Sequence, residues 1–80
     1  MAIQTLYVRV GEAIRRARHA ECLTVTELSK RIGITLAHLQ KIEMGETACS
    51  LHVLVSLADE MDLSLDELVP VAIEEKELVA

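Results

Sequence analysis

Two short helical segments joined by a tight turn constrain the fold of this chain more than any other feature. The first is expected over residues 25–32 and ends at Gly33, a residue type that readily adopts the positive φ found after helices. Only Ile34 and Thr35 separate this glycine from the second segment, which is expected over residues 36–44. Two short helices joined by a three- or four-residue turn that contains glycine predict a helix-turn-helix unit.

Capping signals mark the ends of both segments. Thr24 is the expected N-cap of the first segment, and Glu27 three residues later completes a capping box. Thr35 is the expected N-cap of the second segment, and Gly45 is expected to end it.

The rest of the chain also has apolar residues at helical spacing, and no segment has the pattern of a strand. Further helices are expected over residues 3–21, 51–61 and 65–69. Ser50 is the expected N-cap of the helix over 51–61, and Ser64 with Glu67 forms a second capping box before the last one. The sequence therefore predicts an all-α domain of five helices.

Length and composition indicate one domain with a small core. The chain has 80 residues, of which 51% are hydrophobic and only Tyr7 is aromatic, so the core must be aliphatic. We expect the domain over residues 1–69 and a tail or short helix over residues 70–80. A short chain with so much apolar surface is marginally stable alone, and a homodimer would cover part of that surface.

Cysteine usage and the lack of long apolar stretches bear on location. Cys22 and Cys49 are the only cysteines, and no segment has the pattern of a secretion leader or the length of a membrane span. We therefore expect a cytoplasmic protein with reduced thiols and no membrane contact.

The net charge of −5 argues at first against a nucleic-acid partner, but the charges are unevenly distributed. Residues 1–41 carry seven basic and three acidic side chains, which gives +4. Residues 42–80 carry one basic and ten acidic side chains, which gives −9. This split favours one basic and one acidic face, although random surface charge is the simpler alternative.

A longer string of residues around the two capped segments connects the chain to a known family. The string comprises Val10-Gly11-Glu12, Ile14, Arg18, Leu23-Thr24, Glu27-Leu28-Ser29, Ile32-Gly33-Ile34-Thr35, Leu39, Ile42-Glu43, Gly45, Leu54, Leu57-Ala58, Met61 and Leu63-Ser64-Leu65-Asp66-Glu67-Leu68. With these residues the chain resembles the Cro/phage-repressor type of helix-turn-helix protein, also called the xenobiotic-response-element family, over about residues 8–69. The resemblance implies a repressor-like fold and a sequence-specific, autoregulatory transcriptional regulator that binds a palindromic operator on double-stranded DNA as a homodimer.

A closer resemblance within that family is to the controller proteins of restriction-modification systems. It rests on Leu6-Tyr7, Val10-Gly11-Glu12 and Ile14-Arg15-Arg16. Such controller proteins are homodimers that pair through their last helices and regulate their own promoter. Many small plasmid and phage repressors share the same pattern.

The resemblance makes the second helix of the motif the one that enters the major groove. The candidate readers of DNA are Thr35, Leu36, Ala37, His38, Gln40 and Lys41. Leu36 and Ala37 stand where the family usually has polar side chains, and they can touch only a thymine methyl group. Candidate phosphate contacts are Arg15, Arg16, Lys30 and Thr47, and a solvated basic face is the alternative for the charged ones. Val25 occupies the place of the family's usual glutamine.

The resemblance also implies an ion pair between Arg18 and Glu43 that orients the second helix of the motif, with two solvated charges as the alternative. Cys22 stands where the family usually has glycine after the first helix. We expect either a strained positive φ there or a reshaped turn. Asp62 occupies the matching place after the fourth helix and tolerates positive φ better.

Dimerisation is expected through the last two helices. The candidate interface residues are Val53, Leu57, Leu63, Leu65, Leu68 and Val69. Two-fold symmetry would place two reading helices about 34 Å apart. The acidic half suggests a contact with RNA polymerase. The alternative function is a protein-binding module, such as an antitoxin or anti-activator, that sequesters a partner protein.

Other chemistry has little support in the sequence. His19-x-x-Cys22 and Cys49-x-x-His52 have ligand-like spacing, but the pattern is not that of a common zinc finger, so we expect neither metal nor cofactor. The chain has no glycine-rich phosphate loop and no nucleophile paired with an organised base. We therefore expect no enzymatic activity.

Overall fold

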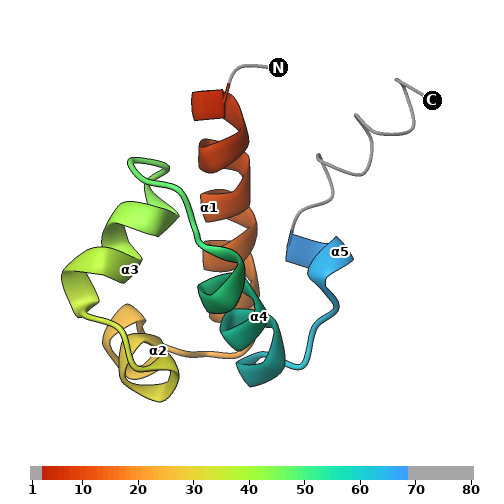
Figure 1. The fold of residues 1–80 in the computed structure, drawn as a ribbon. Coiled ribbons are helices and arrows are strands. Elements are labelled where there is room, and N and C mark those ends of the chain that lie inside the picture. Colours follow the sequence, from red (N-terminus) through yellow and green to blue (C-terminus); the bar gives the residue numbers. More distant parts are fainter. Residues whose placement is uncertain (1–2, 69–80) are drawn as a thin grey trace.

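The computed structural model describes residues 3–68 and contains five helices and no strand in that range (Figure 1). The helices are α1 (Ile3–Ala20), α2 (Val25–Ile32), α3 (Leu36–Glu43), α4 (Leu51–Glu60) and α5 (Leu65–Leu68). The all-α fold with five helices is confirmed. Among the sequence expectations, Val69 and the tail over residues 70–80 lie outside the described range.

Helices α3 and α5 pack on α1, and the helix-turn-helix pair occupies one side of the molecule. Figure 1 shows α2 and α3 on one side of α1 and α5 on the other. Helix α3 packs against both α1 and α2, while α4 contacts α2 and α5. Among the helices of residues 3–68, none packs on one long face of α3.

Aliphatic side chains from all five helices form the core. The fully buried ones are Ile14, Leu28, Leu39, Ile42, Leu57, Met61 and Leu68. Leu57 and Leu68 are among the residues expected in the dimer interface. They have no exposed surface in the single chain, so they belong to its core instead. Val53 is also buried, with 8% exposed. An apolar stripe on a helix serves the core of its own chain first, since that burial is available without a partner.

Local capping explains where the helices begin. The Thr24 hydroxyl accepts from the Glu27 amide at 3.1 Å, and the Glu27 carboxylate accepts from the Thr24 amide at 3.0 Å. These hydrogen bonds lower the pKa of Glu27. The second predicted capping box is only half formed. The Glu67 carboxylate accepts from the Ser64 amide at 2.8 Å, but the Glu67 amide bonds to the Ser64 carbonyl instead of its hydroxyl.

Four helix ends close with a residue in the left-handed region. Gly33 and Gly45 have φ of 75° and 76°, whereas Cys22 and Asp62 have φ of 55° and 54°. After α1, the Leu23 amide donates to the Arg18 carbonyl and the Cys22 amide to the His19 carbonyl, which is the Schellman arrangement. The turn at Cys22 is therefore strained and not reshaped. Helices α1, α3 and α4 end one residue earlier than the sequence predicted.

We predict that Cys22→Gly stabilises the domain by about 1 kcal/mol. The substitution removes the steric cost of a side chain at positive φ, about 1–2 kcal/mol, and this outweighs the greater freedom of glycine in the unfolded chain. Thermal unfolding would show a rise in Tm of about 4–8 °C for a domain of this size. The control is Ala20→Gly, because Ala20 is helical and glycine there lowers stability by about 1 kcal/mol. A fall in Tm for Cys22→Gly would contradict this prediction.

Close approach between α1 and the end of α3 depends on two glycines. A Cβ atom on Gly11 would lie 2.5 Å from the backbone oxygens of both Ile42 and Glu43. A Cβ atom on Gly45, just after α3, would lie 2.6 Å from Cγ2 of Val8. The absence of a side chain at Gly11 and Gly45 therefore lets the end of α3 approach α1 this closely.

Candidate nucleic-acid interface

Helix α3 presents a continuous exposed face that begins at its first turn. Leu39, Ile42 and Glu43 point into the molecule and are buried. The exposed positions are Leu36, Ala37, Gln40, Lys41 and Met44. These positions follow the i, i+4 spacing of one helix face, and four of them (all but Met44) are among the predicted readers.

The start of α3 is fixed by its cap. The Thr35 hydroxyl accepts a hydrogen bond from the His38 amide at 3.1 Å, so the Thr35 oxygen serves the helix itself. His38 is half-buried beside this exposed face. The first exposed side chains of α3 are therefore apolar, while polar groups begin one turn later with Gln40 and Lys41.

A bidentate ion pair holds the inner side of α3 to α1. Arg18 Nε donates to one carboxylate oxygen of Glu43 and Arg18 Nη2 to the other, each at 2.9 Å. The Arg18 and Glu43 side chains are only 11% and 6% exposed. Arg18 Nη1 also donates to the Leu23 carbonyl at 2.9 Å. One guanidinium thus joins the end of α1, the start of the α1–α2 connection and the end of α3.

The basic side chains predicted to contact phosphate are placed on different surfaces. Arg15 lines an open hollow together with Val25, Gln40 and Met44, beside the exposed face of α3. Arg16 lines a separate groove that includes Leu63 and Glu67, on the α5 side of α1.

The two other candidates differ in exposure. Lys30 is exposed on α2, and Thr47 is half-buried in the loop after α3. The neighbour of Lys30, Arg31, is engaged in an ion pair with Glu60 of α4 at 3.2 Å. Arg15 and Lys41 are therefore the basic residues that the structure brings beside the exposed face of α3.

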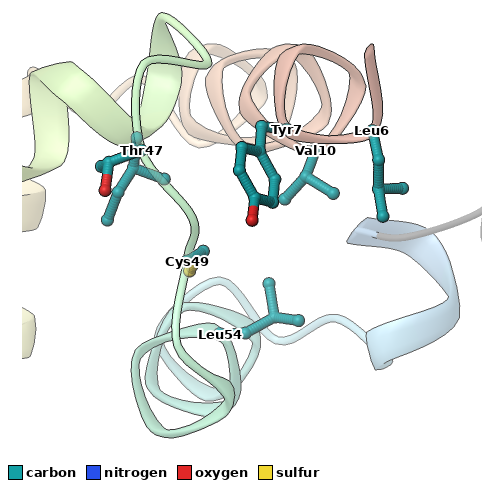
Figure 2. Close-up of a pocket in the computed structure, with 7 residues that line it drawn as sticks. Leu6, Tyr7, Val10, Thr47, Cys49 and Leu54 are labelled. Atoms are coloured by element: carbon teal, nitrogen blue, oxygen red, sulfur yellow. The ribbon is translucent and has the colours of Figure 1, made fainter. Parts of the chain in front are cut away.

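A small apolar cavity lies behind this region, between the first half of α1, the loop after α3 and the start of α4 (Figure 2). Its volume is about 160 Å³, and its lining residues are Leu6, Tyr7, Val10, Ile42, Thr47, Cys49 and Leu54. Burial in this apolar setting raises the pKa of the Cys49 thiol to about 11. Because the thiolate is the reactive form, Cys49 is a poor nucleophile at neutral pH.

The histidines and cysteines with ligand-like spacing in the sequence lie within the described residues. Cys22 and Cys49 are both free thiols. Within residues 3–68, no three side chains of the His, Cys, Asp or Glu type come together in a way that would hold a metal ion. The helices described there also include none of the length and apolar character that crossing a membrane requires.

A short capped helix, a tight turn through Gly33 and a second helix with one face free define a helix-turn-helix domain. Comparison with known families agrees, because residues 14–68 match the HTH_3 family, described as helix-turn-helix. The chain belongs to this family.

Curated relatives and solved structures extend the comparison. The chain is 33% identical over 61 residues to the cryptic phage CTXphi transcriptional repressor RstR of Vibrio cholerae. The aligned segment covers 76% of this chain and 54% of RstR. The curated relatives that it matches are longer, and the matched segments span between 20% and 54% of them. The structure is similar to the restriction-modification controller protein C.AhdI from Aeromonas hydrophila, with a TM-score of 0.74, 27% identity, and coverage of 78% of this chain and 94% of that one.

A second solved structure supports the fold. The clp gene regulator ClgR from Corynebacterium glutamicum matches with a TM-score of 0.78 and 23% identity, covering 88% of this chain and 91% of that one. At this identity the match concerns the fold alone.

Two features of the site were missed by reasoning from sequence. The close contact of Gly11 with the end of α3 has no local signal beyond a glycine within a helix. The exposed apolar residues of α4 are Leu51 and Val55, which the predicted interface set did not include. Helical periodicity could have identified this pair, since the two lie one turn apart on a face that does not meet the core.

Proposed function

We propose that the protein is a DNA-binding transcriptional regulator whose helix α3 enters the major groove. The observation that carries this proposal is the exposed face of α3, held in place on its inner side by the Arg18–Glu43 pair. A helix that reads bases needs one free face and a fixed orientation, and α3 has both. The similarity to RstR, a transcriptional repressor, and to C.AhdI, a restriction-modification controller protein, supports this proposal.

The proposed interface consists of Thr35, Leu36, Ala37, Gln40, Lys41 and Arg15, with His38, Lys30 and Thr47 at its margin. Arg16 is not retained, because it lies in the groove beside Leu63 and Glu67. Phosphate contacts would supply most of the affinity, and they must come from few basic side chains.

We further propose a homodimer on a palindromic operator in the protein's own promoter, with reading helices about 34 Å apart. A domain this small gains stability by covering apolar surface with a second copy. Within the predicted interface set, Leu63 and Leu65 are half-buried and keep surface for a partner. We also propose that the protein is cytoplasmic and that it contacts RNA polymerase.

The second candidate function is a protein-binding module without DNA activity. The net charge of −5 and the apolar first turn of α3 favour it, because both weaken the attraction to DNA. The two functions predict different effects of substituting Arg15 or Lys41. A DNA-binding regulator should bind DNA more weakly, whereas a protein-binding module should keep its function.

The test is fluorescence anisotropy with labelled DNA from upstream of the protein's own gene, with scrambled DNA of equal length, at several salt concentrations. We expect tighter binding to the upstream fragment and a linear fall of log K with log salt. Arg15→Ala and Lys41→Ala should each weaken binding and reduce the salt slope by about 1. Arg16→Ala is the matched control, and its slope should stay unchanged because its side chain lies on the α5 side.

Equal, weak binding to both fragments would overturn the regulator for that promoter. If log K falls with log salt at the same slope for the wild-type protein, Arg15→Ala and Lys41→Ala, then α3 does not form the DNA interface. A protein that does not bind DNA but captures a partner would support the protein-binding module.

A further inference from the structure

The first turn of α3 carries an apolar pair on the face that the proposed function places in the major groove. Leu36 is 39% exposed, and Ala37 beside it is exposed as well. Neither side chain is needed by the core, where Leu39 and Ile42 occupy the buried positions of the same helix. An isolated exposed leucine needs no explanation, but Leu36 is the first residue of the surface that would contact base edges.

Polar alternatives at this turn are already engaged. The Thr35 hydroxyl accepts from the His38 amide at 3.1 Å, and the His38 side chain is half-buried beside the exposed face. Among the exposed side chains of α3, those that can hydrogen-bond a base edge begin one turn later, at Gln40 and Lys41. Leu36 and Ala37, the exposed side chains of the first turn, can therefore distinguish bases only by shape and apolar contact.

One apolar group stands out in the major groove. Thymine carries a methyl group on C5, and cytosine and uracil present only hydrogen there. We propose that Leu36 and Ala37 form an apolar reader of the 5-methyl group of a pyrimidine, with Gln40 and Lys41 contacting neighbouring bases or phosphates. This inference rests on the proposed function, and it assigns to the operator a 5-methylpyrimidine at the position beneath the start of α3. Thymine and 5-methylcytosine both supply this group.

The size of the effect follows from the burial of one methyl group. Removal of a methyl-sized apolar group from a contact corresponds to about a fourfold loss in affinity. A change from thymine to uracil removes the methyl group and leaves the O4 acceptor and the base pairing intact, so it isolates this contact.

The experiment begins with selection of preferred duplexes from a random DNA pool by the wild-type protein. In the best duplex, each thymine is then replaced in turn by deoxyuridine, and Kd is measured by anisotropy. We expect about a fourfold loss at a thymine of each half-site and little change elsewhere. At that position cytosine should bind more weakly than 5-methylcytosine by a similar factor, which tests the second source of the methyl group.

Substitution of Leu36 assigns the effect to this side chain. In Leu36→Ser the ratio of the uracil Kd to the thymine Kd should fall to about 1, and Leu36→Ala serves if the serine variant unfolds. The matched control is Val55→Ser on α4, where a side chain of similar exposure (41%) lies away from α3. The thymine-to-uracil ratio should be unchanged in that variant.

The outcomes distinguish a failure of the proposed function from a failure of the methyl reader. A pool that yields no preferred duplex overturns the proposed function and this inference with it. A preferred duplex that tolerates uracil at every thymine overturns the methyl reader alone. A thymine preference that persists in Leu36→Ser shows that the methyl group is read elsewhere and overturns the assignment.

Discussion

Glu43→Gln is expected to destabilise the domain by about 3 kcal/mol, the largest effect of any single substitution considered. The carboxylate accepts two hydrogen bonds from Arg18 at 2.9 Å, and both side chains are nearly buried. Glutamine keeps the shape but removes the charge and turns an N–H group toward the guanidinium. A buried charge that loses its partner typically costs 3–5 kcal/mol.

Urea unfolding of the single and double variants measures this interaction. Arg18→Met with Glu43→Leu removes both charges together, and it should recover much of the stability lost in Glu43→Gln. Together with the single variants Arg18→Met and Glu43→Leu, this double variant closes a mutant cycle that gives the coupling energy between the two positions. A loss below about 1 kcal/mol in Glu43→Gln would mean that the pair behaves like a surface salt bridge and does not brace α3.

Gly11→Ala is expected to destabilise the domain by about 2 kcal/mol, although alanine is the better helix former by about 1 kcal/mol. The added Cβ atom would lie 2.5 Å from two backbone oxygens at the end of α3, and neither can move unless α3 moves. Overpacking of this kind costs about 1–3 kcal/mol and sometimes more, so the steric effect exceeds the gain in helix propensity.

The sign of the change makes this prediction easy to check. Thermal unfolding should show a lower Tm for Gly11→Ala, and binding to the preferred DNA should weaken as α3 shifts. Glu12→Ala is the control, because Glu12 is the next residue of α1 and is exposed. An increase in Tm for Gly11→Ala would show that the two helices have room to separate.

The helices could be predicted from the sequence, with boundaries correct to within one residue, because their signals are local. Thr24 and Glu27 form the capping box that their spacing indicates, and Gly33 adopts the positive φ expected after α2. Cys22 shows the limit of local reasoning. Its position after α1 left either strain or a reshaped turn open, and only the structure distinguishes them.

The sorting of apolar residues between core and surface could not be predicted. Leu57 and Leu68 lie on apolar stripes that would serve a core or a partner equally well, and periodicity does not tell these apart. Arg15 and Arg16 are adjacent, yet a helix turns about 100° per residue and places them on different surfaces. Such assignments depend on how helices pack, and that information is not local.

The connections made by Arg18 have a consequence for the thermodynamics of association. One guanidinium binds the Leu23 carbonyl and both carboxylate oxygens of Glu43. A rotation of α3 relative to α1 would therefore break this ion pair and leave two largely buried charges without a partner. The orientational entropy of α3 is therefore lost when the chain folds and not when the protein meets its partner. A rigid surface of this kind associates with a smaller entropic penalty than one that orders on contact, and its structure should change little between the free and bound states.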